Sequence, residues 1–95
     1  MNNITDKYKE QALVMKALSH PTRLFIVDEL ARNEKCVQDI ANMVKVDIST
    51  ISKHLNILKI ANVVGFEKRG NCSYYKLIMP CVLDFMVCAC DVSNE

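Results

Sequence analysis

The 95-residue sequence has only two glycines and two prolines, and it has no tryptophan. So few turn-forming residues exclude an all-β chain, which needs many turns, and a low-complexity disordered chain. The two glycines, Gly65 and Gly70, cannot form a glycine-rich phosphate-binding loop. No apolar run approaches the roughly 18 residues of a membrane-spanning helix, so we expect no membrane span. A chain of this length is expected to form one domain, over residues 1–95.

The sequence also lacks the features of a secreted protein. Residues 1–10 are polar and of mixed charge, unlike a signal peptide. The five cysteines are an odd number, which does not suit a closed disulfide framework. We therefore expect a cytoplasmic protein whose thiols are normally reduced.

Apolar residues, by contrast, are abundant and make up 51% of the chain. A domain of this size buries only about 60–65% of the surface that its unfolded chain exposes. The composition therefore predicts that some apolar surface is buried against another chain, most simply in a homodimer.

The formal net charge of +1 is distributed unevenly. Residues 1–44 carry six basic and six acidic residues, whereas residues 45–76 carry six basic and two acidic residues, a net charge of +4. Residues 77–95 carry three acidic residues and no basic one. A solvated surface explains any single lysine, but the clustering favours a polyanionic partner for the central segment.

Hydrophobic spacing predicts four helices in the first two thirds of the chain. The predicted helices span residues 5–18, 21–32, 37–44 and 48–61. Pro21 suits the first position of the second helix, with His20 just before it. Residues 33–35 are predicted to form a turn. Cys36 and Asp47 are predicted to be N-caps of the third and fourth helices, although cysteine is a poor cap.

The fourth predicted helix has two different faces. Its apolar face is predicted to join the core and consists of Ile48, Ile51, Leu55, Leu58 and Ile60. Its opposite face carries small polar and basic residues. Such a helix, after a short helix and a tight turn, is typical of a helix-turn-helix, here residues 36–61. Its small polar side chains suit entry into a DNA major groove about 12 Å wide.

A β-hairpin is predicted after the fourth helix. Gly70-Asn71 lies between strand-forming residues, and this pattern indicates a two-residue hairpin loop. The predicted hairpin covers residues 63–78, with the basic residues Lys68 and Arg69 at its tip.

The last predicted helix is apolar on nearly every face. It covers residues 79–89, with Pro80 in its first turn, and such a helix is expected to be buried against a partner subunit. The predicted fold is thus mainly α with a β-hairpin wing, a winged helix-turn-helix with its elements in the order ααααββα.

The outer face of the fourth helix and the hairpin tip together predict a DNA-binding surface. Serine, threonine and asparagine side chains can bond to base edges or phosphates, and lysine, histidine and arginine to phosphates or guanine. The predicted contact residues are Ser49, Thr50, Ser52, Lys53, His54, Asn56, Lys68 and Arg69. The alternative is an ordinary amphipathic helix beside a solvated hairpin.

Three ordered motifs resemble the ArsR/SmtB family of bacterial and archaeal repressors. Residues 17–24 (ALSHPTRL) are similar to the start of the family's second helix, residues 47–58 (DISTISKHLNIL) to its recognition helix, and residues 68–77 (KRGNCSYYKL) to its wing. The resemblance implies a homodimer that binds double-stranded operator DNA. It also implies dimerisation through the first and last helices, here residues 4–18 and 79–91, and release by a soft metal or a thiol-oxidising inducer.

The cysteines are the candidates for sensing an inducer. One site of the family uses a Cys-Val-Cys pair on the third helix, but the corresponding stretch here, Cys36-Val37-Gln38, lacks the second thiol. Another uses Asp and His on the last helix, which here has Asp84 but no histidine. Three thiolates suit a soft ion such as trivalent arsenic. The candidate sensor residues are Cys36, Cys81, Cys88 and Cys90.

Helix geometry limits how these thiols can combine. Cys81 and Cys88 lie about 10 Å apart along a helix axis, too far for one ion with metal–sulfur bonds of about 2.3 Å. Cys88 and Cys90 can chelate together only where the helix has frayed, with a third thiol from Cys36, Cys81 or the partner chain. A helix N-terminus favours the reactive thiolate form at Cys36. Cys72, beside the wing, is assigned a packing role.

Two other hypotheses stay open. Two cysteines, one of them Cys36, could instead bridge on oxidation or on reaction with a reactive sulfur species. The domain could also be a protein-interaction module that keeps the winged-helix shape without binding DNA. We do not expect an enzyme or an obligatory cofactor, because no nucleophile–base set, metal-activating histidine pair or phosphate loop is present in the sequence.

Overall fold

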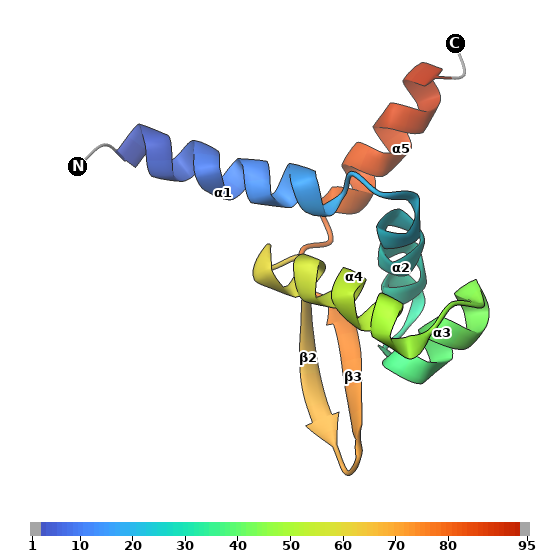
Figure 1. Ribbon diagram of the computed structural model, residues 1–95. Helices are drawn as coiled ribbons and strands as arrows, with labels where there is room; N and C mark the ends of the chain where they lie inside the picture. Colours follow the sequence, from blue (N-terminus) through green and yellow to red (C-terminus); the bar gives the residue numbers. More distant parts are fainter. Residues whose placement is uncertain (1–2, 94–95) are drawn as a thin grey trace.

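The structure is a computed structural model that describes residues 3–93. These residues form five helices and three strands (Figure 1). In chain order the elements are α1 (Asn3–Ala17), α2 (Pro21–Arg32), β1 (Lys35–Cys36), α3 (Val37–Val44), α4 (Ile48–Ile60), β2 (Val64–Arg69), β3 (Cys72–Leu77) and α5 (Val82–Ser93). None of these helices is long and apolar enough to cross a membrane.

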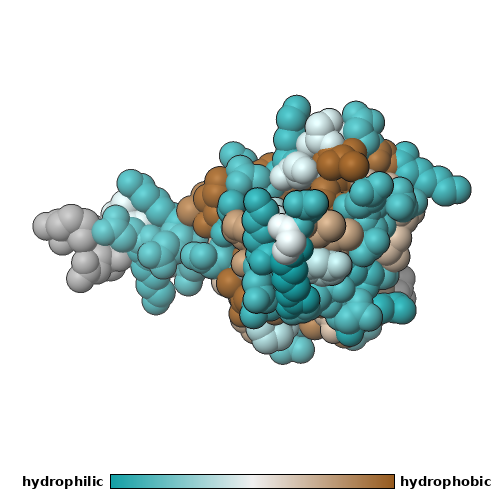
Figure 2. Space-filling view, turned by 90° about the horizontal axis from the view of Figure 1, so that it is seen from below, coloured by the Kyte–Doolittle hydropathy of each residue, from teal (hydrophilic) through white to brown (hydrophobic). Residues whose placement is uncertain are grey.

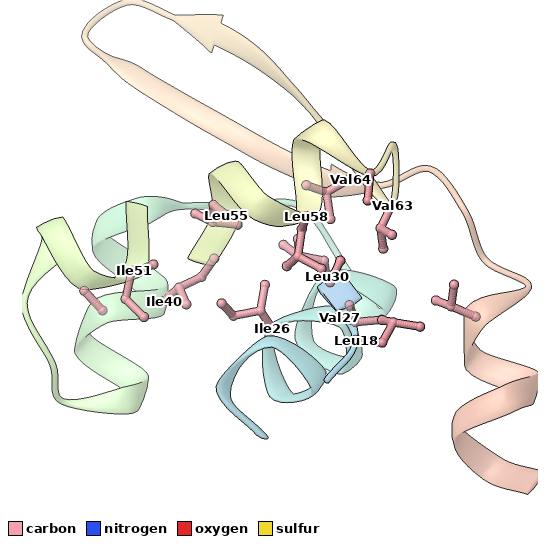
Figure 3. Close-up of a cluster of buried hydrophobic side chains, with 14 residues drawn as sticks. Leu18, Ile26, Val27, Leu30, Ile40, Ile51, Leu55, Leu58, Val63 and Val64 are labelled. Atoms are coloured by element: carbon pink, nitrogen blue, oxygen red, sulfur yellow. The ribbon is translucent and has the colours of Figure 1, made fainter. Parts of the chain in front are cut away.

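The core lies between α2, α3 and α4 and continues to the base of the hairpin. Figure 3 shows the aliphatic side chains of these elements pointing toward one another. The largest fully buried side chains are Ile26, Val27, Ile40, Ile51, Leu55, Leu58, Val63 and Val64. Burial of one such side chain contributes about 1.5–3 kcal/mol. The cluster therefore fixes α4 firmly against the two helices that precede it.

The buried face of α4 is narrower than predicted. Ile51, Leu55 and Leu58 have no exposed surface, because spacings of four and three residues keep them on one side of the helix. The prediction that Ile48 and Ile60 join them is wrong, since 48% and 59% of their surfaces are exposed. Ile60 follows Leu58 by two residues, about 200° round the helix. Ile48, in the first turn, lines a surface pocket instead.

The strands form an antiparallel sheet in the order β1-β3-β2. β2 and β3 make the predicted hairpin, with Val64 opposite Leu77 at its base and Arg69 opposite Cys72 near its tip. A two-residue loop joins them, as predicted. Its first residue, Gly70, has φ 62°, a conformation that glycine adopts without steric cost. The predicted winged helix-turn-helix fold is thus confirmed.

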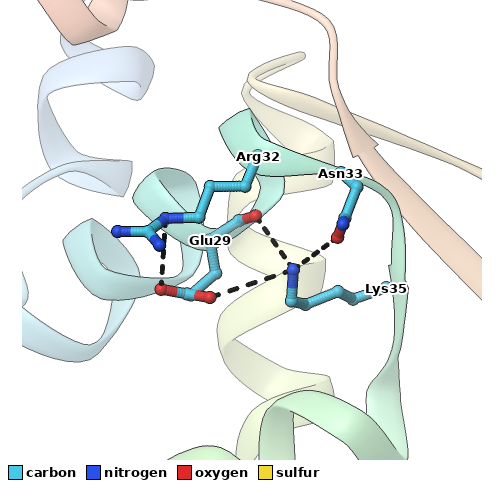
Figure 4. A network of polar contacts seen from close by, with 4 residues as sticks. All are labelled: Glu29, Arg32, Asn33 and Lys35. Atoms are coloured by element: carbon cyan, nitrogen blue, oxygen red, sulfur yellow. Dashed lines mark hydrogen bonds and ion pairs between the residues drawn. The ribbon is translucent and has the colours of Figure 1, made fainter.

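Strand β1 is missing from the predicted order, which was wrong in this detail. The observed order is ααβααββα, because Lys35 pairs with Tyr75 and Cys36 with Tyr74. This pairing satisfies backbone groups at an edge of β3 that would otherwise lack partners. Lys35 Nζ also donates to the backbone carbonyl of Glu29 at 3.2 Å (Figure 4). These contacts hold the end of the predicted turn in an extended form.

Both terminal helices extend away from the core (Figure 1). α1 is anchored at its C-terminal end, where Ala17 and the following Leu18 are buried. Farther toward its N-terminus, Tyr8 and Met15 each expose 57% of their surface. One side of α1 therefore presents apolar side chains that no other part of the described chain covers.

The last helix begins later than predicted. Pro80 and Cys81 form a turn, in which the N–H of Val82 donates to the carbonyl of Met79 at 3.2 Å, and α5 starts at Val82. Val82 is buried, and Leu83 and Met86 pack partly against the core, but Phe85 and Val87 expose 50% and 60% of their surfaces. The burial predicted for this helix is therefore not reached within a single chain.

We expect Leu55→Ala to lower the free energy of unfolding by about 2–5 kcal/mol, because it leaves a cavity in the core. Ile48→Ala is the matched control on the same helix, and its exposed position should limit the loss to at most about 1 kcal/mol. Urea denaturation at one fixed protein concentration, followed by circular dichroism, measures both. Equal losses would contradict the division of α4 into a buried and an exposed face.

Candidate nucleic-acid interface

A short turn joins α3 to α4. Lys45 ends α3 in the left-handed conformation, with φ 65°, and its N–H donates to the carbonyl of Ala41 at 2.8 Å. The N–H of Val46 donates to the same carbonyl at 3.3 Å. Asp47 is the N-cap of α4 as predicted, although its side chain makes no capping hydrogen bond. The two helices and this turn form the predicted helix-turn-helix.

The polar residues of α4 lie on the side away from the core. Ser49, Ser52, Lys53 and Asn56 are exposed, and their spacing of three and four residues places them along one face. Thr50 is half-buried. This face therefore presents small hydrogen-bonding groups and one lysine to solvent, while the opposite face of the same helix is held in the core.

The hairpin adds basic residues to the same end of the molecule. Lys68 is exposed, and Arg69 exposes 46% of its side chain. The face from which the hairpin projects is mostly hydrophilic, with hydrophobic patches toward its edges (Figure 2). A polyanion approaching this face meets polar and charged groups first.

Arg69 is held by two carboxylates. Its Nη2 lies 2.9 Å from Oε1 of Glu67 on the same strand and 2.8 Å from Oε1 of Glu34, which precedes β1. Its guanidinium also lies over the ring of Tyr74, 5.0 Å from the ring centroid. Hydrogen bonding to Glu67 and then to Glu34 raises the pKa of Arg69. A phosphate group that binds Arg69 must therefore compete with both carboxylates.

His54 is placed differently from the other predicted contact residues. It is half-buried, and its ring stacks at a tilt on His20, with 4.5 Å between centroids. Arg23 Nη1 lies 3.0 Å from His54 Nδ1. Burial, followed by the charges of His20 and Arg23, lowers the pKa of His54. Because arginine can only donate, Nδ1 accepts this bond and the proton of the neutral ring is on Nε2.

Arg23 is a functional candidate that the sequence reasoning missed. It is 8% exposed, and its Nε donates to the carbonyl of Ala17 at 2.7 Å. With the bond to His54, this one side chain joins the end of α1 to α2 and α4. A signal was present in the sequence, because Arg23 shares helical spacing with the apolar residues Ile26, Val27 and Leu30.

The cysteines are not gathered into one site. Cys36 is the N-cap of α3, as predicted, and is half-buried there. The other four cysteines are exposed, with no disulfide among the five. Within residues 3–93, no three Cys, His, Asp or Glu side chains are arranged to hold a metal ion. The packing role predicted for Cys72 is wrong, because this residue is exposed beside the hairpin loop, where few neighbours cover it.

Cys36 and Cys72 line one surface pocket of about 260 Å³, which we call the thiol pocket. It lies between the start of α3, the first turns of α4 and the tip of the hairpin, and Ser52 contributes to its wall. The structure thus brings together one predicted sensor residue and one cysteine that was not predicted to be a sensor. Cys81, Cys88 and Cys90 lie elsewhere, in the turn before α5 and on α5 itself.

Comparison with known proteins agrees with this architecture. The family model for bacterial regulatory proteins of the arsR family matches residues 20–65. An uncharacterised helix-turn-helix transcriptional regulator of Methanocaldococcus jannaschii is 42% identical over 74 residues, which cover 77% of this chain and 83% of that protein. The cadmium resistance transcriptional regulatory protein CadC of Listeria innocua is 38% identical over 81 residues, covering 84% of this chain and 68% of CadC.

A solved structure is similar over the whole chain. The solution structure of a homodimeric winged helix-turn-helix DNA-binding domain from Mycobacterium bovis has a TM-score of 0.85 and 28% identity, and the match covers 100% of this chain and 88% of that one. The relatives are transcriptional regulators and not enzymes. The chain therefore belongs to the arsR family of bacterial regulatory proteins and is a transcriptional regulator with that family's winged helix-turn-helix domain.

Proposed function

We propose that the protein is a homodimeric repressor that binds double-stranded operator DNA and is released when a soft metal or metalloid, such as arsenite, binds its cysteine thiolates. The observation that carries the DNA-binding part is the position of the polar face of α4. This face is exposed beside a basic hairpin, while the buried face holds the helix rigidly in the core.

In this proposal α4 reads the major groove and the hairpin contacts the flanking backbone. Ser49, Ser52 and Asn56 bond to base edges or phosphates, and Lys53 bonds to a phosphate or to guanine. Lys68 and Arg69 reach phosphates or the adjacent minor groove. Of the half-buried predicted contacts, His54 acts through its bond to Arg23 by fixing α4, and Thr50 lies at the margin of the contact face.

The proposed dimer uses α1 and α5. Both helices expose large apolar side chains, and such patches mark surfaces that bind another protein. These exposed side chains include Tyr8, Leu13, Met15, Phe85 and Val87. The homodimeric state of the M. bovis domain supports a homodimer here. In a dimer, two copies of α4 would read two half-sites about one helical turn of DNA apart.

The proposed inducer response rests on the thiols and on the relatives. A relative is named for cadmium resistance, and soft ions of this kind prefer thiolate ligands. Cys81, Cys88 and Cys90 lie in or beside α5, which we assign to the dimer interface. Because three ligands do not converge within residues 3–93 of one chain, a three-thiolate site would draw on both subunits.

We expect Lys53→Ala to weaken operator binding and to reduce by about 1 the slope of log affinity against log salt, because one phosphate contact is lost. Fluorescence anisotropy with DNA from upstream of the protein's own gene, at several salt concentrations, measures both quantities. Lys7→Ala, the same change of charge on α1, is the matched control and should leave the slope unchanged. No specific binding by the unaltered protein would favour a protein-interaction module.

A second prediction concerns the carboxylates that hold Arg69. Glu67→Gln should raise DNA affinity by about two- to fivefold, because an exposed ion pair no longer competes with phosphate. In an Arg69→Ala background the same substitution should have little effect on DNA affinity. Anisotropy titrations of the unaltered protein, the two single variants and the double variant measure the coupling between Glu67 and Arg69 directly. Glu29→Gln is the control, because Glu29 pairs with Arg32 and Lys35 away from the hairpin tip (Figure 4). An equal gain in both backgrounds would mean that Glu67 acts directly on DNA.

The proposed release is tested by titrating the preformed DNA complex with arsenite, cadmium, zinc or an oxidant. We expect arsenite or cadmium to dissociate the complex at concentrations near that of the protein, because these soft ions prefer thiolate ligands. The triple variant Cys81→Ser, Cys88→Ser, Cys90→Ser should respond less. Mass spectrometry of the released protein separates the mechanisms, since a bound metalloid supports this proposal and a loss of two thiol protons supports a redox switch.

A further inference from the structure

Two cysteines from distant parts of the sequence lie near each other where β1 pairs with β3. Cys36 pairs with Tyr74 across the strands, and Cys72 lies two residues before Tyr74 on β3. Because side chains alternate between the faces of a sheet, all three residues share one face. Cys36 and Cys72 are therefore diagonal neighbours, a relation in which Cα atoms lie about 7–8 Å apart.

Both cysteines line the thiol pocket. Its volume is about 260 Å³, and Val37 and Ile48 line it together with the two cysteines. Cys72 is exposed and Cys36 is half-buried, so a small molecule from solvent can reach both. The pocket therefore combines two nucleophilic groups with an apolar wall.

The lining of the pocket favours a soft ligand over a hard cation. Of the residues that the structure describes, no carboxylate or imidazole lines it. A direct disulfide suits diagonal neighbours poorly, because unstrained disulfides join Cα atoms about 4.4–6.8 Å apart and diagonal neighbours are typically about 7–8 Å apart. A single atom bonded to both sulfurs at about 2.3 Å spans a wider gap than a direct sulfur–sulfur bond.

We propose that Cys36 and Cys72 form a two-thiol site for a trivalent arsenical that carries one organic group. Two As–O bonds of R–As(OH)₂ are replaced by two As–S bonds, each thiol proton leaves with a hydroxyl group as water, and arsenic stays trivalent. The organic group lies against Val37 and Ile48. The pocket is large enough for a phenyl ring, since a cavity of about 150 Å³ binds benzene.

This site adjoins the proposed DNA-binding surface. Ser52, on the outer face of α4, lines the same pocket, so a bound arsenical lies between α4 and the wing. It also links the N-cap of α3 covalently to β3. An effect on DNA release rests on the proposed function, whereas binding of the arsenical does not.

The test uses the full chain, kept reduced by a phosphine, with phenylarsine oxide as the probe and excess glutathione to remove singly bonded adducts. Native mass spectrometry counts the phenylarsenic groups retained. We expect the variant Cys81→Ser, Cys88→Ser, Cys90→Ser to retain one group bonded to two sulfurs. Adding Cys36→Ser or Cys72→Ser to that variant should weaken binding roughly 100-fold or more, because the two-point attachment is lost.

Tight binding that survives either added substitution would overturn the proposal. So would a failure of the triple variant to bind the probe while both remaining thiols still react with a thiol-counting reagent. Circular dichroism verifies that each variant is folded. We expect the Cys72→Ser variant to fold, because Cys72 is exposed. DNA binding by the triple variant is a separate measurement. Failure of this variant to retain the probe with DNA binding intact refutes the two-thiol site alone, and retention of the probe without DNA binding refutes the repressor alone.

Discussion

The whole arrangement depends on the packing of one face of α4 against α2 and α3. Leu55 and its neighbours on that face have no exposed surface, so the helix cannot rotate about its axis without opening the core. The orientation of the polar face follows directly from this constraint. Arg23 adds a polar restraint to the apolar one, because its guanidinium bonds both to the carbonyl of Ala17 at the end of α1 and to His54 on α4. The helix assigned to dimerisation and the helix assigned to DNA are thereby joined through a single buried side chain.

Most of the fold could be predicted because its determinants are local. The helices α2, α3 and α4 follow from apolar spacing, and the hairpin loop follows from Gly70-Asn71. Strand β1 could not be predicted in the same way, because two residues show no alternation and their pairing partners, Tyr75 and Tyr74, lie 40 and 38 positions away. The start of α5 was predicted too early because proline is common in the first turn of a helix. Here Pro80 instead lies in the turn that precedes the helix.

The candidate site was predicted less completely, for a related physical reason. Residue type and helical spacing indicate which side chains of α4 can face DNA, but not which of them bond to other parts of the protein. By residue type and position on α4, His54 looks like a DNA-contact residue. Its ring nitrogen is nevertheless bonded to Arg23, which lies on another helix. Arg69 is likewise basic in sequence, but Glu34, from a different part of the chain, lies beside it. The position of Cys72 next to Cys36 depends on the register of β1 on β3, which no local pattern encodes.

These tertiary contacts also bear on how a nearly neutral protein binds a polyanion. The net charge of +4 in residues 45–76 overstates the free positive charge at the hairpin, because Glu34 lies outside that segment and pairs with Arg69 inside it. Attraction to any DNA is thereby moderated, since sequence-independent affinity depends on the number of phosphates neutralised. In the proposed complex, discrimination between sequences then relies more on the hydrogen-bonding groups of α4. Ser52 belongs to this set and also lines the thiol pocket, so the surface proposed to read the bases adjoins the thiols proposed to bind an arsenical.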